Sequence, residues 1–128
     1  MLADKQSAKP GQMAERQKRY VSHALVEVRK YKILPFFCQS AVLLDLSLGG
    51  FKLEFTAEVQ VTPGNRYWLN VPLSPLGIYS PKRLLTQCEC RWFDDNRYRI
   101  GGVFLGLSKT EQMLIEQIVA TLRSRSSL

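Results

Sequence analysis

The chain has 128 residues, enough for one domain with a core of its own but too few for two full domains. A hydrophobic content of 45% excludes a mostly disordered chain, and no apolar run approaches the roughly 18 residues that a membrane-spanning helix needs. The formal net charge of +7 favours anionic partners such as nucleic acid, phosphorylated small molecules or anionic lipid, without choosing among them.

The N-terminal end is polar and basic. Residues 1–14 combine Lys, Gln, Ser, Pro and Gly with little apolar content, which predicts a mobile tail. They carry no apolar block of the kind found in a secretory signal, so we expect the cytoplasm as the compartment. A basic arm follows at residues 15–20, where Arg16, Lys18 and Arg19 place three positive charges in four positions. Such an arm is either a solvated flank of the domain or a clamp that closes over an anion.

The first strand is predicted at residues 22–31, where Ala24, Val26 and Val28 alternate with other side chains. The apolar segment that follows is broken by Pro35 and is interpreted as a turn. The second strand is predicted at residues 40–45.

The stretch from Asp45 to Gly50 ends the second strand and opens the third. In an extended chain, residues two apart share a face, so Asp45 and Ser47 present a carboxylate and a hydroxyl on one side. Gly49 and Gly50 lack a Cβ, which allows a turn or a close approach of a ligand. The leucines of this stretch are expected to point into a core: Leu44, Leu46 and Leu48. The residue types alone fit either a turn between two strands or a polar ligand site.

Further turn signals divide the rest of the chain into short strands and one helix. The later strands are predicted at residues 50–55, 67–73, 84–93 and 98–105. A capping box, Ser108 to Glu111, starts a helix at residues 109–123. Its apolar stripe is formed by Met113, Leu114, Ile115, Ile118, Val119 and Leu122. These elements predict a six-stranded antiparallel β-barrel or rolled sheet, with the C-terminal α-helix packed on the sheet or closing one end.

The sequence offers no constellation typical of an enzyme or a metal site. His23 is the only histidine, and the sequence has no Ser or Cys nucleophile motif for which it could act as the base. The cysteines, Cys38, Cys88 and Cys90, lack a paired Cys-x-x-Cys pattern and are expected to be ordinary thiols. We therefore expect a binding protein without catalytic residues, cofactor or metal.

The order of these features resembles the PilZ family of bacterial cyclic-di-GMP receptors. A basic arm with arginines, a strand, and an Asp-x-Ser-x-x-Gly motif follow one another in a chain of six strands and one helix. The late segment at residues 97–104 is similar to that family's last strand. The resemblance extends from residue 15 to residue 122, and it implies a single PilZ-like domain at residues 15–125.

The resemblance also implies a site. In PilZ receptors an Arg-x-x-x-Arg pair in the arm binds phosphates and guanine edges, while the Asp or Asn, the Ser and the Gly of the second motif line a guanine pocket. Asp45, Ser47 and Gly50 match the second motif, whereas Arg16 and Arg19 stand one residue closer together than the family's pair. The implied cyclic-di-GMP site consists of Arg16, Lys18, Arg19, Asp45, Ser47, Gly49 and Gly50.

Three functions stay open on this basis. The first is a non-catalytic receptor in which cyclic-di-GMP orders the arm against the barrel and changes a surface read by an unidentified effector protein. The second is a PilZ-like domain without nucleotide binding, acting as an interaction adaptor through the C-terminal helix or an exposed Ile78–Tyr79 pair. The third, which we do not favour, is single-stranded nucleic-acid binding. Its stacking platforms would be Tyr20, Tyr67, Trp68 or Trp92, which fit strand cores equally well.

Overall fold

A computed structural model describes residues 24–32 and 38–126 of the chain. The predicted tail and basic arm, with Arg16, Lys18 and Arg19, lie outside the described residues. His23 and Tyr20 also lie outside them.

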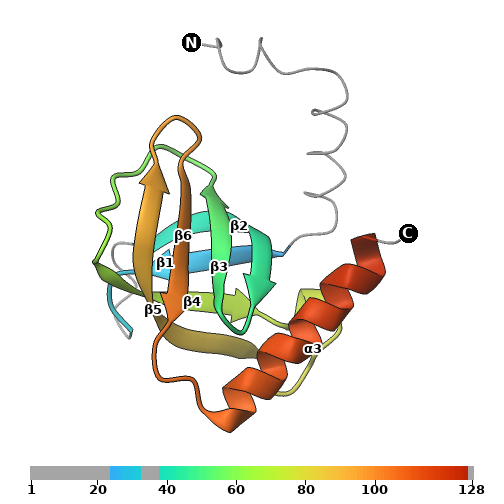
Figure 1. The fold of residues 1–128 in the computed structure, drawn as a ribbon. Helices are drawn as coiled ribbons and strands as arrows, with labels where there is room; N and C mark the ends of the chain where they lie inside the picture. Colours follow the sequence, from blue (N-terminus) through green and yellow to red (C-terminus); the bar gives the residue numbers. More distant parts are fainter. Residues whose placement is uncertain (1–23, 33–37, 127–128) are drawn as a thin grey trace.

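The described residues form a closed antiparallel barrel with a C-terminal helix (Figure 1). Its elements in chain order are β1 (Leu25–Arg29), β2 (Cys38–Ser47), β3 (Gly50–Phe55), β4 (Arg66–Pro72), the 3-10 helix η1 (Ser74–Leu76), β5 (Arg83–Asp94), β6 (Arg99–Phe104) and α3 (Lys109–Ser126). Around the barrel the strands follow the order β1-β2-β3-β6-β5-β4. The predicted six-stranded antiparallel barrel with one C-terminal helix is confirmed.

The strand bounds differ from the predicted ones mainly in β1 and β2. β1 ends at Arg29, which pairs with Cys38, the first residue of β2. β2 is longer than predicted because it is paired along both edges, with β1 at its start and with β3 as far as the Ser47–Gly50 pair. The ends of a strand therefore depend on which residues of the neighbouring strands pair with it, and these pairing partners lie outside the local sequence.

Helix α3 closes one end of the barrel. Ser108 Oγ accepts a hydrogen bond from the Glu111 amide at 3.1 Å, and a Glu111 carboxylate oxygen accepts one from the Ser108 amide at 2.8 Å, so the predicted capping box is confirmed. Leu114, Ile115 and Ile118 are buried in the barrel core. Met113 is 61% exposed, and its predicted place in the apolar stripe is wrong. Each residue turns a helix by about 100°, so Met113 points away from Ile115.

A bulge in β2 sets which residues face outward near its end. Leu43 pairs with Leu53 and Asp45 pairs with Lys52, so Leu44 is an extra residue in the ladder. Leu43 and Leu46 are consequently both buried although they are three residues apart, and Leu44 is buried as well. Asp45 and Ser47 are left exposed on the outer surface.

The expectation that Leu48 points into the core is wrong. Leu48 is 43% exposed. It stands with Gly49 at the tip of the tight hairpin that the Ser47–Gly50 pair closes, beyond the edge of the barrel wall.

A second bulge lies in β5. Cys90 pairs with Gly102 and Trp92 pairs with Gly101, which leaves Arg91 as the extra residue. Cys90 is buried, whereas Trp92 is 41% exposed. The bulge therefore turns Trp92 to the outside of the barrel, where strict alternation from Cys88 and Cys90 would have placed it inside.

The three cysteine thiols differ in access, which gives a first testable expectation. Cys88 and Cys90 are buried and Cys38 is half-buried. Burial, reinforced by neighbouring Cys90, raises the pKa of Cys88 from 9.0 to about 12. A thiol-specific reagent should therefore label Cys38 in the native protein, and Cys88 and Cys90 only after unfolding, because the thiolate is the reacting species. Peptide mass spectrometry reads the positions. Fast labelling of Cys88 in a folded Cys38→Ser variant would contradict the buried assignment.

Candidate functional site

The predicted Asp-x-Ser-x-x-Gly stretch lies on the outer surface of the barrel, at the hairpin that joins β2 to β3. Asp45 Oδ1 accepts a hydrogen bond from the Leu46 amide at 2.9 Å, and Ser47 Oγ accepts one from the Gly49 amide at 3.2 Å. Both contacts are local, and both residues are exposed. Among the described residues, no other group bonds to the Asp45 carboxylate. The stretch thus forms a turn and also presents an acceptor-rich surface to solvent.

The two glycines of the motif have different surroundings. A Cβ built on Gly50 would lie 2.2 Å from the carbonyl oxygen of Gly102 on β6. A Cβ on Gly49 would meet only Ser47 Oγ, at the ordinary contact distance of 3.7 Å. Gly50 is therefore required by the close approach of β3 to β6, while the fold leaves room for a side chain at position 49.

A row of outward-facing residues continues from Asp45 across three more strands. Asp45 pairs with Lys52 on β3, Lys52 pairs with Gly101 on β6, and Gly101 pairs with Trp92 on β5. Neighbouring strands are about 4.8 Å apart, so the row spans about 14 Å from Asp45 on β2 to Trp92 on β5. The row therefore combines an anion, a cation and an aromatic surface on one side of the barrel.

The Trp92 indole rests on Gly101. A Cβ on Gly101 would lie 2.1 Å from Trp92 Nε1 and 2.3 Å from the adjacent ring carbon, so the missing side chain makes room for the ring. Lys52 and Trp92 were not among the predicted site residues, since their position beside Asp45 depends on strand register and on the β5 bulge. The sequence gives no local signal for the outward position of Trp92, because an apolar residue there continues the alternation of Cys88 and Cys90.

Ala24, the first described residue, lies near this row. The Leu43 amide donates a hydrogen bond to the Ala24 carbonyl at 2.9 Å, so the first described residue lies beside β2, two positions before Asp45. An extended chain covers at most about 3.5 Å per residue, so the five residues from Arg19 to Ala24 can span about 17 Å and the eight from Arg16 about 28 Å. The chain length therefore allows both arginines to reach the row.

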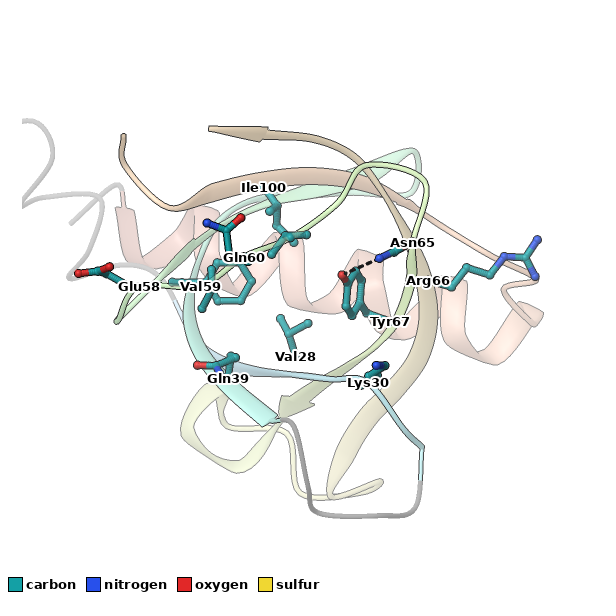
Figure 2. Close-up of a pocket in the computed structure, with 12 residues that line it drawn as sticks. Val28, Lys30, Gln39, Glu58, Val59, Gln60, Asn65, Arg66, Tyr67 and Ile100 are labelled. Carbon is teal, nitrogen blue, oxygen red and sulfur yellow. Dashed lines mark hydrogen bonds between the residues drawn. The ribbon is translucent and has the colours of Figure 1, made fainter. Parts of the chain in front are cut away.

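A cavity lies elsewhere, at the end of the barrel opposite the β2–β3 hairpin. It has a volume of about 690 Å³ and is lined by the ends of β1 and β3, the starts of β2, β4 and β6, and the loop between β3 and β4 (Figure 2). Of the predicted site, the described residues Asp45, Ser47, Gly49 and Gly50 do not line it. Tyr67 points into this cavity, whereas Trp92 is on the outer surface, so the aromatics considered as stacking platforms do not share one face.

No helix among the described residues is long and apolar enough to cross a bilayer.

The family model described as the PilZ domain matches residues 15–121. No curated protein sequence matches the chain. One similar solved structure is the PilZ domain of CeSA from a cellulose-synthesizing bacterium, with a TM-score of 0.57 and 14% identity, covering 79% of this chain and 93% of that one.

A second is the PilZ domain of YcgR from Escherichia coli with c-di-GMP. Its TM-score is 0.61 at 17% identity, and the match covers 81% of this chain and 84% of that one. At these identities the two structures show a shared barrel fold.

Proposed function

Since the chain belongs to the PilZ domain family, we propose that it is a non-catalytic receptor for cyclic-di-GMP, formed by residues 15–125. The observation that carries the proposal is the exposed pair Asp45 and Ser47, held on the outer face of β2 shortly after Leu43, whose amide bonds to Ala24, the first described residue. The similar YcgR domain is in complex with c-di-GMP, which supports the same ligand here.

In this proposal one guanine lies against the β2–β3 hairpin. The Asp45 carboxylate accepts from the guanine N1–H and from its exocyclic amine, since an ionised carboxylate has several acceptor positions. Ser47 adds a hydroxyl on the same face. Hydrogen bonds to a charged group contribute roughly 1.5–3 kcal/mol each, so Asp45 is the largest single contributor from the barrel.

The arm supplies the positive charge for the phosphates. Arg16, Lys18 and Arg19 make charge-assisted hydrogen bonds to the diphosphate ring, and an Arg plane can stack on a purine. Lys52 and Trp92 extend the site along the outer row, as a further cation and a stacking surface.

Ligand binding is proposed to order the arm against the barrel. Ordering costs about 1–2 kcal/mol per residue fixed, so the arm closes only when the ligand contributes its contacts. The closed arm then presents a changed surface to an effector protein. We place the receptor in the cytoplasm, because none of its three cysteines forms a disulfide, which is typical of a reducing compartment.

Calorimetric titration tests the proposal. Cyclic-di-GMP should give saturable heat with the folded wild-type chain, and Arg19→Ala should bind at least about tenfold more weakly because one charge-assisted bond is lost. Arg97→Ala is the matched control, since Arg97 is an exposed arginine in the β5–β6 hairpin. An absence of heat from folded wild type at tens of micromolar would overturn the proposal.

A second candidate is an interaction adaptor that has lost the nucleotide. The close spacing of Arg16 and Arg19 favours it, because an arm one residue short aims its guanidinium groups differently. The Ile78–Tyr79 surface expected for such an adaptor is only half present: Ile78 is buried and Tyr79 is 75% exposed. Capture of a partner that is unaffected by cyclic-di-GMP and lost in Tyr79→Ser would favour the adaptor, whereas dependence on Asp45 would favour the receptor.

A further inference from the structure

The cavity at the open end of the barrel has the form of a small-molecule pocket. Figure 2 looks into it along the barrel, with α3 behind the wall. Val28, Phe55, Val61 and Ile100 form its inner surface, and all four are buried side chains of the core. The volume of about 690 Å³ lies within the roughly 300–1,000 Å³ typical of ligand pockets. A six-stranded barrel is too narrow for an open lumen, so the cavity is a mouth with an apolar floor.

Asn65, Tyr67 and Lys30 lie on one side of the mouth, and the uncharged amides of Gln39 and Gln60 lie on the other (Figure 2). Tyr67 points into the cavity from β4, and its hydroxyl oxygen accepts a hydrogen bond from Asn65 Nδ2 at 3.5 Å, as the dashed line in Figure 2 marks. A phenol that accepts from Asn65 retains its own proton for donation to a ligand. Lys30 stands at the rim near Tyr67 and adds a positive charge.

The other charged residues at the rim do not point into the cavity beside Tyr67 and Lys30. Glu58 and Arg66 extend away from the opening in opposite directions (Figure 2). Arg66 also lies 3.9 Å from Glu89 on the neighbouring strand. The head group that fits the mouth is therefore an acceptor with negative charge, above an apolar body that matches the floor.

We infer that the barrel mouth binds a small amphipathic carboxylic acid. Its apolar chain or ring lies against Val28, Phe55 and Ile100, and its carboxylate accepts from the Tyr67 hydroxyl and from Lys30. This site is separate from the proposed nucleotide site, at the other end of the barrel.

Titration with decanoate, below its micellar concentration, tests the inference by amide NMR of the full chain. Saturable shifts should be confined to the residues around the mouth. Val59→Trp, which fills the cavity from the β3–β4 loop, should abolish them. Tyr67→Phe and Lys30→Gln should each weaken binding by about three- to tenfold, as expected for loss of one hydrogen bond or charge contact. Lys82→Gln, in the loop between β4 and β5, is the matched control and should bind like wild type.

Two further measurements make the test more specific. Decanol has the same chain without the charge, so it should bind more weakly than decanoate and should not distinguish Lys30→Gln from wild type. Thermal unfolding of each variant checks the fold. An absence of saturable shifts in wild type, or decanoate binding unchanged in folded Val59→Trp, would overturn the inference. Cyclic-di-GMP titration of the same samples distinguishes the two proposals. If the protein binds decanoate but does not bind cyclic-di-GMP, the proposed receptor function is wrong and the inference about the mouth stands.

Discussion

Replacing Asp45 by alanine is expected to lower the affinity for cyclic-di-GMP by about 100-fold while leaving the barrel folded. The substitution removes a charged acceptor from two donors on the guanine edge, and two bonds of about 1.5 kcal/mol each correspond to this factor. The fold is expected to persist because Asp45 is exposed and bonds only to the adjacent Leu46 amide within the described residues. Calorimetry measures the affinity, and thermal unfolding checks the fold.

Two variants control this result. Asp95→Ala makes the same charge change at an exposed position of the β5–β6 hairpin and should bind like wild type. Asp45→Asn keeps one acceptor oxygen and should bind between wild type and Asp45→Ala. Wild-type affinity in folded Asp45→Ala would show that the nucleotide does not use the β2–β3 hairpin.

Replacing Gly50 by alanine is expected to lower the free energy of unfolding by about 3 kcal/mol, at the upper end for overpacking. The new Cβ would lie 2.2 Å from the Gly102 carbonyl oxygen, a backbone atom in a paired strand that has little freedom to move. β3 and β6 would have to separate where Phe51 pairs with Gly102. Urea unfolding measures the loss.

Gly49→Ala is the matched control for this prediction. Its Cβ would be 3.7 Å from Ser47 Oγ, an ordinary contact, so the stability should stay within about 0.5 kcal/mol of wild type. Equal unfolding midpoints for the two variants would mean that the strands yield at Gly50 more easily than the geometry indicates. A loss of nucleotide affinity in the stable Gly49→Ala variant would point to a close approach of the ligand at the hairpin tip.

Much of the fold follows from local signals in the sequence. Alternation in residues 24–28 marks β1, and the capping box at Ser108 starts α3 at the predicted residue. Met113 and Leu48 were misplaced for different reasons. Met113 lies at the border of the apolar stripe, where helical spacing alone does not decide whether a side chain is buried. Leu48 lies at a hairpin tip beyond the barrel wall, where the alternation of a strand no longer applies.

The site divides in the same way. Asp45, Ser47 and Gly50 stand in one short motif, so a sequence pattern can identify them as candidates. Lys52, Gly101 and Trp92 come together only through the register of β3, β6 and β5. That register depends on pairing between distant segments and on a bulge with no local signature, so it could not be predicted from periodicity.

The bulge at Leu44 limits how the length of β2 can change. The ladder already places Asp45 directly after Leu43, opposite Lys52. Removing Leu44 would therefore leave a regular strand in which all the remaining side chains keep their present faces. Loss or gain of one residue anywhere else between Ala41 and Ser47 would exchange the faces of one half of the strand, turning either the leucines outward or the carboxylate inward. Natural or engineered single-residue length variation in this strand should therefore be confined to position 44.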